Sequence, residues 1–142
     1  MRIMGIDYGD SRTGIALSDP FGWTAQGLET IRLKGDMTGF IDRIKSLVEE
    51  YKVDKIVVGF PRNMNGTIGP RGEKTEKFIN LLKSSINDIE VVKWDERLTT
   101  VAANRAIHDM GMKTSKKKGM ADQIAAVYIL QGYLDSINVG KR

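Results

Sequence analysis

Residues 2–18 have the sequence RIMGIDYGDSRTGIALS. Two apolar runs flank a short polar turn with glycine, which predicts strands at 1–8 and 13–19 joined as a hairpin. Asp7 falls where the first strand ends. A carboxylate at the end of a buried strand is costly unless a cation binds it, so Asp7 indicates a metal or phosphate site on a sheet. The alternative is a solvated turn aspartate, because turns favour aspartate and glycine for local reasons.

Further strands are predicted at 27–33, 55–59 and 90–94. The run at 55–59 contains the continuous β-branched stretch Ile56–Val58, which is typical of a central strand buried on both faces. Three strands come first, and strands then alternate with helices. This order predicts an α/β fold: a mixed five-stranded sheet flanked by helices, antiparallel at the start and parallel later. We expect one domain over residues 1–142.

Four helices are expected from the apolar spacing. The first is capped by Asp36 or Thr38, and the second runs over 73–86. The third runs from Thr99 or Thr100 to Met110, with Gly111 ending it. A lysine-rich loop follows, and the last helix runs from Ala121 to about Ser136. The inward residues should be Phe40, Ile44, Leu47, Val48 and Tyr51 in the first, Phe78, Leu82 and Ile86 in the second, and Ile124, Val127, Tyr128 and Leu134 in the last.

Composition limits the chemistry. The chain has no cysteine, and His108 is its only histidine, so a metal site must use oxygen ligands, which favour Mg²⁺, Mn²⁺ or Ca²⁺ over Zn²⁺. His108 itself is expected to be structural or at the surface. No apolar run approaches the roughly 20 residues of a membrane helix, and residues 1–8 do not resemble a signal peptide. We therefore expect a cytoplasmic protein with no membrane partner.

Acidic residues are expected to gather at one end of this sheet. Asp7 ends the first strand, Asp95 and Glu96 end the fifth, and Asp122 opens the last helix. Small residues at Ala121, Ala125 and Ala126 should let that helix approach the sheet. Two divalent ions about 3.5–4 Å apart would relieve the repulsion among the carboxylates and catalyse phosphodiester hydrolysis. Each acid also has a local explanation, such as a macrodipole interaction for Asp122.

Several blocks resemble the YqgF family, the group of pre-16S ribosomal RNA nucleases also called RuvX-type Holliday junction resolvases. The blocks span nearly the whole chain: Gly5–Gly9 with Arg12, Gly14, Ile15 and Ala16; Gly59–Pro61; Asn63–Thr67 with Gly69 and Pro70; Asp95–Thr100; and Asp122–Leu134. The resemblance implies an RNase H-like fold and metal-dependent nuclease chemistry with Mg²⁺ or Mn²⁺.

The resemblance assigns Asp7, Glu96 and Asp122 as the catalytic, metal-binding acids. Asp95 is a further candidate, although adjacent strand residues point to opposite faces, so that one of Asp95 and Glu96 should face away. Arg12 and Arg97 are expected to touch phosphate or to brace the carboxylates, and we favour a bracing ion pair for Arg97.

Nucleic acid is the expected partner of the basic residues. The net charge is +4, which permits a polyanionic partner but does not require one. Residues 63–72 are expected to close over nucleic acid, or else to form an ordinary flexible loop. Trp23 and Trp94 are candidates for stacking on bases, although Trp94 is expected in the core. The residues expected to bind nucleic acid are Arg12, Arg62, Asn63, Arg71, Arg97, Lys116, Lys117 and Lys118.

The sequence therefore predicts a metal-dependent nuclease acting on structured nucleic acid, either the 5′ region of precursor 16S rRNA or a Holliday junction in DNA. A non-catalytic nucleic-acid-binding or ribosome-assembly module is an alternative. A phosphate-binding ATPase related to sugar kinases is another, but that class needs two such lobes. The protein is expected to be a monomer or a homodimer, and a dimer would favour branched DNA.

Overall fold

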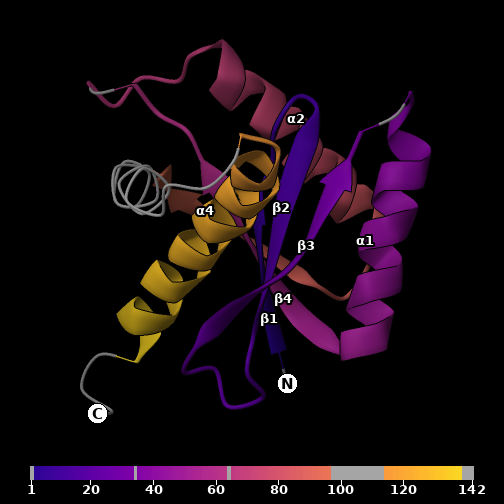
Figure 1. Ribbon diagram of the computed structural model, residues 1–142, viewed down its shortest axis with the longest axis vertical. Helices are drawn as coiled ribbons and strands as arrows, with labels where there is room; N and C mark the ends of the chain where they lie inside the picture. The colour runs from indigo at the N-terminus through magenta and orange to yellow at the C-terminus, as the bar shows by residue number, and fades with distance from the viewer. Residues whose placement is uncertain (1, 34, 64, 97–113, 139–142) are drawn as a thin grey trace.

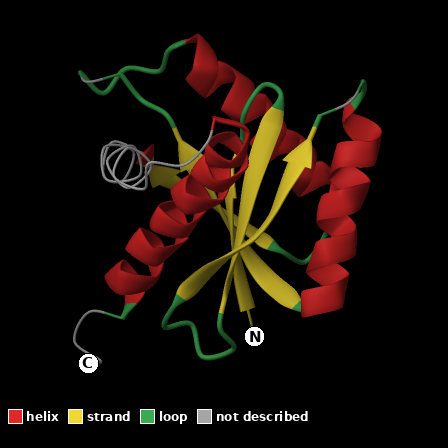
Figure 2. Cartoon of the chain, in the orientation of Figure 1, coloured by secondary structure: helices red, strands yellow, loops and turns green. Residues whose placement is uncertain are grey.

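The computed structural model describes residues 2–33, 35–63, 65–96 and 114–138, with the backbone alone over 114–120. Five strands form one sheet in the order β3-β2-β1-β4-β5. They are β1 (Arg2–Asp7), β2 (Arg12–Ser18), β3 (Ala25–Arg32), β4 (Val53–Phe60) and β5 (Glu90–Asp95) (Figure 2). Strands β1, β4 and β5 are parallel, and β2 and β3 are antiparallel. The predicted mixed five-stranded sheet is confirmed.

Helices cover both faces of the sheet (Figure 1). Helices α1 (Met37–Tyr51) and α2 (Pro70–Ser85) pack on one face, and α4 (Thr114–Ile137) packs on the other. Alternate residues of a strand point to opposite faces, so Ile56 and Val58 of β4 join the core under α1 and α2, whereas Val57 lies under α4. None of the helices seen in the described ranges is long and apolar enough to cross a membrane.

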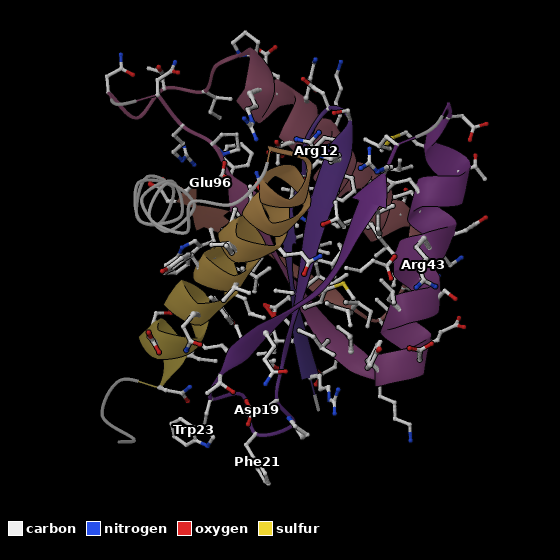
Figure 3. The ribbon with its side chains drawn as sticks, viewed as in Figure 1. Arg12, Asp19, Phe21, Trp23, Arg43 and Glu96 are labelled. Carbon is white, nitrogen blue, oxygen red and sulfur yellow. The ribbon has the colours of Figure 1, made fainter. Side chains whose placement is uncertain are left out.

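Helix α1 begins where the sequence predicts. Asp36 is its N-cap, and the Asp36 carboxylate accepts a hydrogen bond from the backbone N–H of Thr38 at 3.0 Å. Four of the five predicted inward residues are buried, and Tyr51 is partly buried. Arg43 ties this helix to β3 through a two-pronged pair with Glu29, at 2.8 and 2.6 Å (Figure 3).

Helix α2 begins at Pro70, three residues before the predicted start. Proline suits the first position of a helix, because its fixed φ is helical and its missing N–H would have no partner there. Phe78, Leu82 and Ile86 are buried as predicted.

Helix α4 corrects the prediction in two ways. It begins at Thr114, so residues 114–120, which were expected in a lysine-rich loop, are helical, and this is consistent with the good helix propensity of lysine. Its buried face is also rotated: Tyr128 is 37% exposed, and Ile124 and Val127 are only partly buried. The stretch 127–130 is apolar throughout, so its periodicity could not identify the buried face. Leu134 is buried as predicted, and the buried apolar residues over 121–137 are Ala126, Ile129, Leu130, Tyr133 and Leu134.

The close approach of α4 depends on glycines of the sheet as well as on its own small residues. A β-carbon at Gly14 would lie 1.9 Å from the backbone oxygen of Asp122, and one at Gly59 would lie 2.4 Å from Cδ1 of Ile129. Trp94 was expected in a central strand, but β5 is an edge strand and Trp94 is only partly buried, edge-on to Tyr133. The predicted helix ending at Met110 lies outside the described residues, as does His108.

Candidate active site

Asp7 is the last residue of β1 and lies on the face of the sheet that α4 covers, because its neighbour Ile6 points into the opposite core. Burial raises the pKa of the Asp7 carboxyl well above its usual range. The charge of Glu96 and a hydrogen bond to Glu96 raise it further, as does the charge of Asp122, while Arg71 acts in the opposite direction. Two acidic residues, Glu96 and Asp122, therefore converge on Asp7.

Glu96 reaches this face because Gly59 leaves room for it. A β-carbon at Gly59 would lie 3.0 Å from Cγ of Glu96. Asp95 pairs in register with Phe60, whose side chain is in the core under α1 and α2. Paired residues of neighbouring strands point to the same face, so Asp95 belongs to the face opposite Asp7. The geometry thus brings Glu96, rather than Asp95, to Asp7.

Asp122 lies more than two turns inside α4, not in its first turn. The helix macrodipole acts within the first turn, so it does not explain an acid at this position. Asp122 sits above Gly14, and Gly14 is the cross-strand partner of Asp7. Arg12, the first residue of β2, donates from Nε to Oδ2 of Asp122 at 2.8 Å. Sequence reasoning expected such a bracing ion pair at Arg97, which lies outside the described residues.

These acids do not stand as a preformed metal cage. Within the part of the chain that the structure describes, no group of three or more acidic or histidine side chains is arranged to hold a metal ion. Asp7 shares a hydrogen bond with Glu96, and Asp122 pairs with Arg12. The donor set itself fits a hard divalent cation, because crowded carboxylates that resist ionisation gain most from such a charge.

Close packing at Gly9 and ring stacking by Tyr8 fix the turn that follows Asp7, and the sequence did not predict either contact. A β-carbon at Gly9 would lie 2.4 Å from the backbone oxygen of Arg12, so only glycine fits this turn. Tyr8 stacks on Phe78 of α2, with ring centroids 4.2 Å apart and an angle of 4° between the rings. The one available signal was the aromatic residue directly after Asp7.

Three of the residues predicted to bind nucleic acid lie at or near the beginning of α2. Arg71 is close enough to lower the pKa of Asp7 by its charge. Arg62 lies over the ring of Phe60, 5.2 Å from its centroid. The Asn63 side chain donates to Oγ1 of Thr67 at 3.0 Å, within a hydrogen-bonded turn. Side chains at Lys116, Lys117 and Lys118 lie outside the described part of the chain.

The aromatic residue Trp23 lies away from this site. It is on the β2–β3 connection, and Figure 3 shows it at the opposite end of the molecule from Arg12 and Glu96. Base stacking by Trp23 would therefore occur far from the converging acids.

A mixed sheet of this order, with carboxylates meeting at the ends of β1 and β5, is the arrangement of an RNase H-like domain. Residues 1–136 match the family model described as RuvX, Holliday junction resolvase, and the chain belongs to this family. A protein of Acetivibrio thermocellus is 68% identical over 136 residues, covering 96% of each chain. A protein of Ruminiclostridium cellulolyticum is 55% identical over 142 residues, covering 100% of this chain and 99% of the relative. Both carry the name "Putative pre-16S rRNA nuclease".

Solved structures agree with this fold. RuvC of Thermus thermophilus, solved with a Holliday junction substrate, aligns with a TM-score of 0.58 at 12% identity, covering 99% of this chain and 97% of that one. The fowlpox virus Holliday junction resolvase aligns with a TM-score of 0.55 at 14% identity, covering 96% and 99%. The predicted RNase H-like fold is confirmed, and family membership identifies the chain as a hydrolytic nuclease.

Proposed function

We propose that this nuclease is a metal-dependent endonuclease that processes the 5′ end of precursor 16S rRNA in the cytoplasm. The observation that carries the proposal is the convergence of Glu96 and Asp122 on Asp7, whose pKa is raised by burial and then by the charges of these two acids. The names of the two relatives, which are 68% and 55% identical, favour this RNA over other substrates.

Asp7, Glu96 and Asp122 would hold Mg²⁺ or Mn²⁺ through carboxylate oxygens. A bound ion of this kind activates water and stabilises the leaving oxygen of a phosphodiester. The chain's own contribution is to orient the substrate: Arg71, beside Asp7, supplies a fork of N–H donors that suits a phosphate near the bond to be cleaved. Arg62 lies on the connection between β4 and α2, and it would add a second positive charge for the nucleic acid.

Cleavage assays test the proposal directly. Substrates would be a precursor 16S RNA with its 5′ leader and a four-way DNA junction, each with Mg²⁺. We expect Asp7→Asn, Glu96→Gln and Asp122→Asn each to lower cleavage of the RNA by at least about 10²-fold, as loss of a metal ligand or of its support typically does. Asp95→Asn is the matched control, because Asp95 belongs to the opposite face of the sheet, and it should retain activity close to wild type.

Other outcomes would identify the alternatives. The family description favours a Holliday junction resolvase, and preferential cleavage of the DNA junction by a homodimer would support that function instead. Equal cleavage activity of wild type and Asp7→Asn would contradict the assigned site. RNA binding without cleavage in every variant, wild type included, would favour a ribosome-assembly module.

A further inference from the structure

Arg12 binds the carboxylate of Asp122, which is one of the three proposed metal ligands. Its Nε lies 2.8 Å from Oδ2 of Asp122, and the two side chains are 27% and 18% exposed. Arg12 starts β2 and Asp122 lies on α4, so this ion pair joins the sheet to the helix directly beside Asp7. The contact is specific, because the guanidinium meets a partly buried carboxylate within normal hydrogen-bond distance.

Arg12 binds one of the two carboxylate oxygens of Asp122, so the ion pair lowers the affinity of this carboxylate for a metal ion. A carboxylate that accepts a charge-assisted hydrogen bond loses basicity toward a cation, and the positive guanidinium repels a second positive charge. Release of Oδ2 from Arg12 would make both carboxylate oxygens of Asp122 available to the cation.

A phosphate is the group best suited to draw Arg12 away. Guanidinium has five N–H donors, and the structure gives Arg12 a single partner among the described residues, which leaves donors for a two-pronged contact. A backbone phosphate at this edge of the sheet would exchange the Arg12–Asp122 pair for an Arg12–phosphate pair. Asp122 would then be free to bind the cation.

We propose that Arg12 is a positioning residue that couples the two ligands: it holds Asp122 until a nucleic-acid phosphate takes its guanidinium, so that nucleic acid and divalent metal bind cooperatively. The coupling is reciprocal, because each ligand must strengthen the other by the same factor. This inference rests on the proposed function, since it assumes that Asp122 is a metal ligand.

The test measures Mn²⁺ affinity by isothermal titration calorimetry, without RNA and with a saturating short RNA duplex. Phosphorothioate linkages keep the charge of that duplex and slow its cleavage. In wild type, RNA should tighten Mn²⁺ binding by about fivefold or more. Arg12→Gln should bind Mn²⁺ more tightly than wild type without RNA and should lose most of the tightening by RNA. A merely structural role for Arg12 predicts the opposite change, a weaker metal site.

Arg32→Gln is the matched control. Arg32 is the cross-strand partner of Arg12 and is exposed, so the variant removes the same charge from the neighbouring strand without touching the Arg12–Asp122 pair. It should behave as wild type. Arg12→Lys keeps the charge but loses the fork of donors, and it should show reduced coupling.

Failure of the Arg12 coupling and failure of the metal site would give different results. Mn²⁺ affinity in Arg12→Gln equal to or below that of Arg32→Gln would overturn the coupling and leave the metal site standing. Wild-type Mn²⁺ affinity in Asp122→Asn would instead overturn the metal site itself. Should Arg12→Gln fail to fold, undiminished coupling in Arg12→Lys would overturn the inference.

Discussion

At the scale of the residue, the surroundings of Asp7 oppose the ionised state that a metal ion would bind. Its carboxyl is placed where burial and two other acids oppose ionisation, although ionised oxygens are what a metal ion binds. Functional sites commonly contain residues that lower the stability of the fold, and replacing such a residue commonly stabilises the protein.

Removing the Asp7 charge should therefore stabilise the metal-free protein. The pKa of Asp7 is raised in the folded state, so its favourable contribution is complete below the unfolded pKa and is lost as the pH rises through the folded pKa. In EDTA at neutral pH, Asp7→Asn should raise the free energy of unfolding by about 0.5–2 kcal/mol. The gain should disappear in acid below the unfolded pKa, as measured by urea denaturation.

Asp42→Asn is the control for that measurement, because Asp42 is exposed on α1. It should change stability by no more than about 0.5 kcal/mol. A metal-free Asp7→Asn protein less stable than wild type at neutral pH would contradict the account of the site.

At the scale of the element, the contact between α4 and the sheet positions Asp122. Gly14 lets the helix backbone approach β2, and the same contact places Asp122 above the cross-strand partner of Asp7. The site thus depends on a helix–sheet distance that a single methyl group would change.

Gly14→Ala should disturb this contact severely. The added β-carbon would lie 1.9 Å from a backbone oxygen that cannot move without shifting α4. Overpacking of this kind typically costs about 1–3 kcal/mol, occasionally more, and activity should fall further because Asp122 moves with the helix. Thermal denaturation and cleavage assays would measure the two effects.

Gly39→Ala is the matched control on the other face. Nothing lies within 4 Å of a β-carbon at Gly39, which is inside α1, so alanine should add about 0.5–1 kcal/mol of stability. Equal stability of the two variants would show that α4 does not pack against β2 as closely as described.

At the scale of the whole molecule, the position of the positive charges matters more than the net charge. The net charge of +4 is modest, yet Arg12 and Arg71 lie around the carboxylates, so the attraction for phosphate is local. Binding of nucleic acid should weaken steeply as salt rises, because each neutralised phosphate releases counterions.

Arg71→Gln should reduce this salt dependence. Loss of one phosphate contact should lower the slope of log K against log salt by about 0.7–0.9, measured by fluorescence anisotropy with RNA. Lys83→Gln removes one charge from the last turn of the same helix, away from Asp7, and should leave the slope unchanged. Identical slopes for Arg71→Gln and wild type would remove Arg71 from the nucleic-acid surface.

The sequence by itself determined the strand pattern and the mixed sheet, and it limited the cap of α1 to Asp36 or Thr38, because these depend on local periodicity and on hydrogen bonds between near neighbours. The structure shows that the cap is Asp36. Its motifs also indicated the family, which the match over residues 1–136 confirms. The roles of Asp7, Glu96 and Asp122 remain predictions that the geometry supports.

Only the tertiary structure decided which face of α4 is buried, that Glu96 rather than Asp95 shares the face of Asp7, and that Arg12 pairs with Asp122. Each of these depends on how segments far apart in the chain pack together. The stretch 127–130 is apolar all round, so its pattern is equally compatible with several orientations. In the observed orientation α4 lies so close to β2 at Gly14 that a β-carbon there would be 1.9 Å from the backbone oxygen of Asp122, and this contact sets the position of Asp122.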